Sequence, residues 1–200
     1  MRSVDPDDSL IRLDAALRRE ADELLDGRGL RRLLEEYGRL HVTGSYALRL
    51  MTWRDLDLYL EVPELSVERF FELGGRIAAL LAPMRMTFHH DREGQSELEG
   101  HEALYWGIKP DVTGETWKID LHAVRSHVLR ALLARNERIT ARLTPEKRLT
   151  ILRIKSALWR HAEYRKGFAS QDIYDAVLDA DVTDLDAFGK YLSRTKGISL

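Results

Sequence analysis

The chain has 200 residues with a formal net charge of −2, and 44% of them are hydrophobic and 32% charged. This length and composition are typical of a globular protein with one large or two small cores. The absence of cysteine excludes disulfides and thiolate metal sites, and no apolar run approaches the ~20 residues that span a bilayer. We therefore expect a cytoplasmic protein that has no membrane partner.

The elements follow one another in two blocks. The first predicts helices at 7–26, 29–37 and 66–82, a helical turn at 46–51, and strands at 40–43, 55–62, 84–88, 103–108 and 117–124. A polar turn at 93–100 and a loop at 109–116 separate the later strands. The second block predicts only helices, at 126–142, 146–163, 170–179 and 184–194.

Charge is distributed unevenly along the chain. Residues 125–166 hold twelve Lys or Arg against three Glu, a local charge of +9 that leaves −11 for the rest. This shift coincides with the change to purely helical sequence. We predict an α/β (α+β) catalytic domain over 1–125, including the N-terminal helices, and an all-helical C-terminal domain over 126–200.

The strand at 55–62 carries two aspartates on one face. Strict alternation places Asp55 and Asp57 opposite a row of leucines, so the leucines enter a core and the carboxylates lie side by side. Aspartates are poor strand formers and like charges on one face repel, so the pair is unfavourable without a cation between them. A divalent metal ion is the simplest such cation; solvated acids on an edge strand are the alternative.

Two further features bear on this choice. The Gly44-Ser45 turn lies just before the aspartate strand, and a glycine lets backbone amides approach a phosphate closely. Asp120 lies on the polar face of the strand at 117–124. If the two strands are neighbours, three carboxylates offer the oxygen ligands that Mg²⁺ prefers, and phosphoryl transfer commonly uses two such ions.

These elements together resemble a known family. Gly44-Ser45, nine residues, Asp55-Leu56-Asp57 and then Asp120 in an apolar strand are similar to the signature of the DNA polymerase β-like nucleotidyltransferase superfamily. The motifs cover about residues 40–124, and a helical C-terminal region is also similar to the family's layout. The chain departs from many members at Leu48 to Leu50, where a second glycine is common, and at Arg54, where a serine is common.

The resemblance implies a mixed sheet backed by helices and transfer of an NMP, AMP by family habit, from an NTP to a hydroxyl acceptor with release of pyrophosphate. Gly44 and Ser45 would hold the triphosphate. Asp55, Asp57 and Asp120 would bind two Mg²⁺ ions, or Mn²⁺, and Asp120 would also be the candidate base. The acceptor would be a small hydroxylated molecule, an RNA end or a protein side chain. A catalytically weak binding module, such as an antitoxin-like partner, is the alternative function.

The helix at 146–163 carries two candidate phosphate contacts. Lys155 is centred on an apolar stripe and Arg148 lies two turns earlier on the same stripe. A lysine in this place either packs its stem and reaches water or faces the triphosphate. We predict Lys155, and more weakly Arg148, as nucleotide-binding residues.

Several other side chains have more ordinary interpretations. The histidines at 89, 90 and 101 lack the spacing of a transition-metal site and are expected at strand ends. His122 shares a face with Asp120 and is either a partly buried histidine or a group on the acceptor side. The aromatic residues Tyr105, Trp106 and Trp117 are expected in the core.

Overall fold

The computed structural model describes residues 6–92, 101–112 and 114–200 and divides into two compact units. The sheet unit comprises residues 18–48 and 54–136, and the helical unit comprises residues up to 17, 49–53 and 137–200. This division differs from the predicted boundary at 125. Helices α1 (Pro6–Asp22) and α5 (Ser126–Arg142) each contribute residues to both units, and the predicted turn at 93–100 lies outside the described residues.

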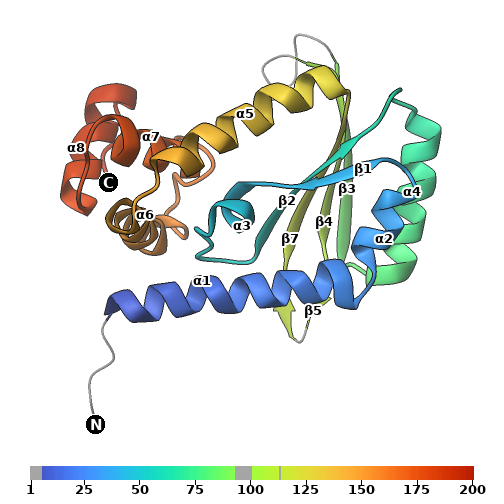
Figure 1. Ribbon diagram of the computed structural model, residues 1–200, viewed down its shortest axis with the longest axis horizontal. Helices are drawn as coiled ribbons and strands as arrows, with labels where there is room; N and C mark the ends of the chain where they lie inside the picture. The colour runs from blue at the N-terminus through green and yellow to red at the C-terminus, as the bar shows by residue number, and fades with distance from the viewer. Residues whose placement is uncertain (1–5, 93–100, 113) are drawn as a thin grey trace. The chain divides into compact units, whose positions relative to one another are not determined.

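The sheet unit is built on a mixed five-stranded sheet in the order β1-β2-β7-β4-β3 (Figure 1). Its strands are β1 (Arg39–Val42), β2 (Asp55–Glu61), β3 (Arg85–Asp91), β4 (Ala103–Lys109) and β7 (Lys118–Val124). β2 and β7 pair in parallel, and the other three pairs are antiparallel. The sequence prediction of a mixed sheet backed by helices is confirmed.

The alternation predicted for the two central strands is present. Leu56 and Leu58 on β2 and Ile119 and Leu121 on β7 have no measurable solvent exposure. Their face packs beneath α2 (Leu30–Glu35) and α4 (Val67–Leu81), which cover this side of the sheet (Figure 1). Burying one face of each strand fixes the register, and it directs every alternate polar side chain to the opposite face.

Helix α4 approaches the sheet closely at Trp106. The indole Nε1 of Trp106 donates to the carbonyl of Phe70, and a Cβ at Gly74 would lie 2.7 Å from the Trp106 ring. The side chain of Ser66 caps the helix by accepting from the amide of Arg69. Trp106 and Trp117 are core residues as predicted.

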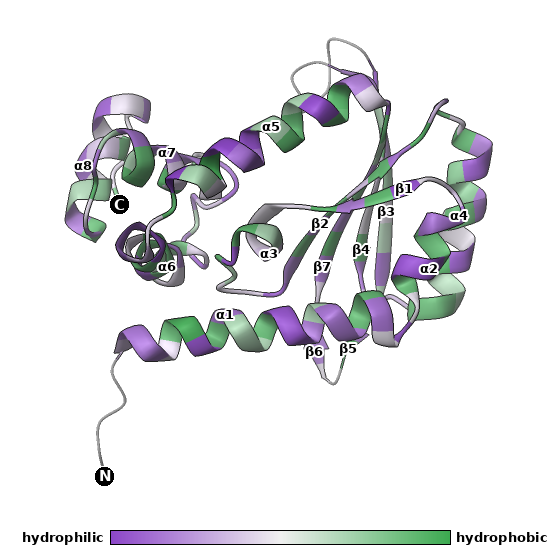
Figure 2. Cartoon of the chain, viewed as in Figure 1, coloured by the Kyte–Doolittle hydropathy of each residue, from purple (hydrophilic) through white to green (hydrophobic). Residues whose placement is uncertain are grey.

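The opposite face of the sheet is covered at one end by the first turns of α5. Val128 and Leu129 form a small core with Ala103 and Val124, and Tyr59 packs against it. Hydrophobic and hydrophilic residues alternate along α5, as they do along α1 (Figure 2). The end of the sheet face beneath α5 is therefore apolar, and the polar side chains of this face lie at its other end.

The segment predicted as a loop at 109–116 contains a short hairpin of β5 (Asp111–Val112) and β6 (Glu115–Thr116). Gly114 adopts a φ of 82°, which glycine accepts without steric cost. Two residues in each strand are too few to produce a detectable alternation. Composition therefore indicated the turn but not the strands.

The helical unit contains α6 (Pro145–Leu158), α7 (Ser170–Asp179) and α8 (Leu185–Lys196). The side chain of Thr144 caps α6 by accepting from the amide of Lys147. α6 ends five residues before the predicted 163, because the chain turns there and Arg165 adopts a φ of 65°. No helix in the described ranges has the length and apolar character needed to cross a membrane.

Candidate active site

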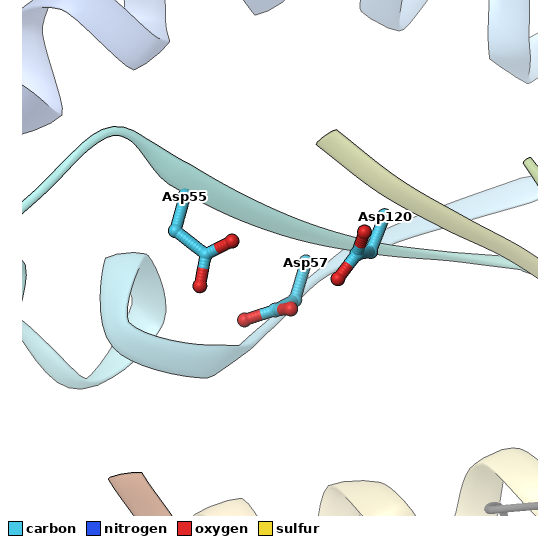
Figure 3. A group of neighbouring side chains, drawn as sticks. All are labelled: Asp55, Asp57 and Asp120. Carbon is cyan, nitrogen blue, oxygen red and sulfur yellow. The ribbon is translucent and has the colours of Figure 1, made fainter. Parts of the chain in front are cut away.

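Three carboxylates meet on the polar face of the sheet. Asp55 and Asp57 are two residues apart on β2, so they share a face, and Asp57 is the direct register partner of Asp120 on β7. Each side chain offers a carboxylate oxygen that lies within 4.8 Å of the others. Figure 3 shows the three side chains directed to the same side of the two strands. Pairing of β2 with β7 therefore brings together the three carboxylates that the sequence analysis grouped.

A lysine that the sequence analysis gave no role lies among these carboxylates. Lys118 is the register partner of Asp55 and precedes Asp120 by two residues, so alternation places it on the same face. Its ammonium Nζ lies 3.0 Å from Asp55 Oδ1 and also donates to Asp120 Oδ2. The spacing of two from Asp120 was the available signal, because it predicts a shared face.

The charge state of Lys118 follows from two opposing effects. Burial lowers the pKa of its ammonium, but the negative charges of Asp55 and Asp120 raise that pKa by more, so the net shift is upward. The lysine is therefore protonated at neutral pH. It offsets part of the repulsion that three clustered carboxylates would otherwise carry.

Asp120 has a second donor on its other oxygen. The hydroxyl of Tyr105, on the neighbouring strand β4, donates to Asp120 Oδ1 at 2.8 Å. Burial and then the charge of Asp120 raise the pKa of Tyr105, so its phenol stays protonated and remains a donor. Tyr105 was expected in the core, but it is half-buried and its hydroxyl belongs to the site.

The Gly44-Ser45 turn lies directly against Asp57. Helix α3 (Gly44–Leu48) follows β1 and begins at the glycine, two residues before the expected start. Gly44 has a φ of 58°, which favours glycine, and a Cβ there would lie 1.8 Å from Asp57 Oδ2 and would displace the Asp57 side chain. The amide of Thr43 donates to the carbonyl of Asp57 at 2.9 Å, which fixes the turn to the aspartate strand. Ser45 is buried beside it.

His122 lies further along the same face, between two tyrosine rings. Its ring centroid is 5.2 Å from that of Tyr59 and 4.8 Å from that of Tyr105. Burial lowers the pKa of His122 to about 4, and its Nδ1 has no hydrogen-bond partner among the described residues. The imidazole is therefore neutral at physiological pH and packs as an aromatic ring.

Comparison with known proteins gives matches at the level of structure. Neither a family model nor a curated protein sequence matches the chain. Two solved structures of the Cid1 poly(U) polymerase match, one with Mg and 3′-dATP bound and one with MgATP. The first has 14% identity, covers 80% of this chain and 48% of that one, and has a TM-score of 0.57. The second has 15% identity, coverage of 82% and 50%, and a TM-score of 0.58.

A cytoplasmic RNA terminal U-transferase matches in the same way, with 14% identity, coverage of 85% of this chain and 53% of that one, and a TM-score of 0.56. The chain therefore shares the nucleotidyltransferase fold of these structures. It spans about half the length of these solved structures. At this level of identity the likeness concerns the fold.

The nucleotidyltransferase fold gives the acidic group a context. Three carboxylate oxygens are hard ligands of the kind that Mg²⁺ and Mn²⁺ take, so the donor set fits a divalent cation. Among the described residues, these three aspartates are the group of acidic or histidine side chains that comes close enough to hold an ion. The described histidines at 89, 90 and 101 do not form a second such group.

The two basic residues predicted to contact a nucleotide, Lys155 and Arg148, lie in the helical unit. Lys155 is 1% exposed, and its ammonium donates to the carbonyl of Leu50 at 2.7 Å and to the hydroxyl of Tyr174 at 3.2 Å. Arg148 donates from Nη1 to the carbonyl of Arg49 at 2.8 Å. Both side chains thus hold the segment 49–53 against α6, and their contact with a nucleotide stays a prediction.

Proposed function

We propose that this protein is a metal-dependent nucleotidyltransferase that moves an NMP, with AMP as the first expectation, from an NTP to a hydroxyl acceptor. The observation that supports the proposal most directly is the group formed by Asp55, Asp57 and Asp120 on a nucleotidyltransferase fold. The Gly44-Ser45 turn, which lies against Asp57, would hold the triphosphate.

The chemistry requires one bond to form and one to break. The acceptor oxygen attacks the α-phosphorus, the bond from that phosphorus to the bridging oxygen of the β-phosphate breaks, and pyrophosphate leaves with the electron pair. When bound to Asp55, Asp57 and Asp120, divalent ions would neutralise charge on the triphosphate and lower the pKa of the acceptor hydroxyl.

The chain's own residues would position the reacting groups and take up the proton of the acceptor hydroxyl. Asp120 is the candidate base for the acceptor proton, since it lies on the strand next to the Asp55–Asp57 pair. The hydroxyl of Tyr105 on Asp120 Oδ1 fixes the rotation of that carboxylate. Ser45, buried beside Gly44, would donate its hydroxyl or amide to a phosphate oxygen.

The structural neighbours suggest which acceptor and nucleotide to test first. Their names describe a poly(U) polymerase and an RNA terminal U-transferase, and their bound nucleotides are 3′-dATP and ATP with Mg. An RNA 3′ end is therefore the first acceptor, and ATP and UTP are the first donors. Small hydroxylated molecules and protein side chains follow as the other acceptor classes.

The test is transfer of label from α-³²P-labelled NTPs in Mg²⁺, with RNA that carries either a 3′-hydroxyl or a 3′-deoxy end, and in parallel with small-molecule and protein acceptors. We expect a labelled product that requires a hydroxyl on the acceptor, is lost in Asp57→Asn and is retained in Asp111→Asn. Asp111 is a matched control because it is exposed and outside the carboxylate group, and an asparagine can still accept from Thr116. Full turnover by Asp57→Asn would overturn the assignment.

One observation favours the alternative of a binding module with weak or no catalysis. The ammonium of Lys118 already neutralises part of the carboxylate charge, so the fold has a cation of its own at this place. Thermal unfolding with Mg²⁺-ATP against ATP alone separates the two functions, because a ligand that binds the folded state raises its stability. A rise that depends on Mg²⁺ supports the enzyme, and no effect of any NTP supports the module.

A further inference from the structure

Lys118 is placed among the proposed metal ligands by the register of the sheet. Its side chain is 23% exposed, and those of Asp55 and Asp120 are 18% and 16% exposed. Its ammonium bridges the two strands by contacting Asp55 on β2 and Asp120 on β7. In this arrangement the lysine links carboxylates that would otherwise repel one another across the strand pair.

The oxygens that Lys118 contacts belong to two of the three proposed metal ligands. Both oxygens of Asp120 accept hydrogen bonds, Oδ1 from the hydroxyl of Tyr105 and Oδ2 from the ammonium of Lys118. An ion that takes Asp55 Oδ1 and Asp120 Oδ2 as ligands would bind at ~2.1 Å from each, inside the space that the ammonium needs. Ion and ammonium therefore compete for the same two oxygens.

We propose that Lys118 is an internal counter-ion that holds the carboxylate group together until a divalent cation displaces its ammonium. The proposal rests on the proposed function, since it assumes that Asp55, Asp57 and Asp120 bind metal. Lysine suits this exchange because its charge sits on a flexible four-carbon stem, and the partial exposure of Lys118 gives the ammonium a path to water. Lys118 is a positioning residue in this scheme and regulates how tightly the site binds its ion.

The neighbouring arginine does not share this role in the structure. Arg54 directly precedes Asp55, but its guanidinium pairs with Glu20 at 2.7 Å and with Glu115 at 3.3 Å. Removal of Lys118 should therefore remove the ammonium contacts that Asp55 and Asp120 receive in this structure. Two effects follow: the cation-free protein loses stability, and divalent ions bind more tightly because they no longer displace an ammonium.

The experiment measures Mn²⁺ binding by the EPR signal of the free ion and thermal unfolding in EDTA or Mg²⁺, without any nucleotide. The variants are Lys118→Met, the milder Lys118→Gln, and the matched control Lys109→Met, since Lys109 is exposed at the end of β4. We expect both Lys118 variants to bind Mn²⁺ roughly tenfold more tightly, the size of one partly buried charge interaction. Their melting temperatures should fall in EDTA and rise further than that of the wild type on adding Mg²⁺.

The outcomes separate this inference from the proposed function. If wild type and Lys118 variants bind Mn²⁺ equally and Asp57→Asn does not, the exchange is overturned and the metal site stands. If neither wild type nor the Lys118 variants bind Mn²⁺, the metal site and the exchange are both overturned. Lys118→Gln keeps the result decisive if Lys118→Met fails to fold.

Discussion

Each unit holds a lysine with hydrogen bonds inside that unit, and the two lysines have different surroundings. Lys118 is partly buried and Lys155 is fully buried. Lys118, in the sheet unit, donates to the carboxylates of Asp55 and Asp120. Lys155, in the helical unit, donates to a backbone carbonyl and to the hydroxyl of Tyr174, whose ring also lies 5.5 Å from the ammonium. Lys118 offsets a cluster of negative charge, whereas Lys155 ties the segment 49–53 to α6 and α7.

The difference shows that an unusual sequence position and a functional contact need not coincide. Lys155 was predicted to contact a nucleotide because a lysine centred on an apolar stripe is rare. In the structure its ammonium makes two hydrogen bonds inside the helical unit. Lys118 follows an ordinary alternating pattern, yet its register places it among the candidate catalytic carboxylates. In the sheet unit a lysine contacts a cluster of carboxylates, and in the helical unit a lysine holds packed segments together.

The largest effect is expected when a carboxylate of the proposed metal site is removed. Asp57→Asn should lower NMP transfer by roughly 10³-fold or more, because losing a metal ligand removes several kcal/mol of transition-state stabilisation. Its stability should stay equal or rise slightly, because the variant removes one repelling charge from the group. Single-turnover transfer assays and urea unfolding measure the two quantities, and a large loss of stability would contradict this account of the group.

Next in size is the loss of the lysine in the helical unit. Lys155→Ala should lower the free energy of unfolding by about 3 kcal/mol, because it leaves a cavity and takes the donor from the Leu50 carbonyl. Lys190→Ala, an exposed lysine of α8, should change it by less than about 0.5 kcal/mol. Urea unfolding followed by circular dichroism measures the free energy of unfolding of both variants. Equal values would show that the hydrogen bonds and packing of Lys155 do not stabilise the helical unit.

Gly44→Ala tests how closely the turn approaches the carboxylate group. We expect a loss of about 2 kcal/mol, from the positive φ and from the displacement of Asp57 by a Cβ only 1.8 Å away, together with weaker Mn²⁺ binding. Gly29→Ala is the matched control, because Gly29 has a φ of 79° and a Cβ there would meet no atom within 4 Å. It should cost about 1 kcal/mol and leave Mn²⁺ binding unchanged. Equal effects of the two variants would remove the argument for a steric requirement at Asp57.

The smallest effect concerns Glu61, which lies on the same face of β2 as Asp55 and Asp57. Hydrogen bonds, and not a lysine, hold its carboxylate. Hydrogen bonds with the side chains of Ser126 and His41 lower the pKa of Glu61 below its ordinary value. The charged Glu61 carboxylate therefore stabilises the folded state at pH values above its unfolded-state pKa near 4.5. This stabilisation is lost as the pH falls through the lower folded-state pKa. Glu61→Gln should flatten the acid limb of a plot of stability against pH. An unchanged acid limb would show that these hydrogen bonds do not favour the charged form.

Much of the candidate site could be predicted because its features are local. Alternation along β2 and β7 identified the leucine face and the aspartate face, and both faces are as expected. The short hairpin of β5 and β6 and the early end of α6 were missed, since each depends on a few residues without a periodic pattern. The hydrogen bond from Tyr105 to Asp120 was also missed, because nothing along the chain states that β4 lies next to β7.

The sequence by itself determined which side chains share a strand face, because successive side chains in a strand point to opposite sides. It thereby identified Asp55, Asp57 and Asp120 as polar-face residues and Gly44 as the residue of a tight turn. Only the tertiary structure decided that β2 and β7 are parallel neighbours with Asp57 opposite Asp120 and Lys118 opposite Asp55. Strand pairing joins residues some sixty positions apart, and it is chosen by burial of the leucine faces beneath α2 and α4, which no local pattern records.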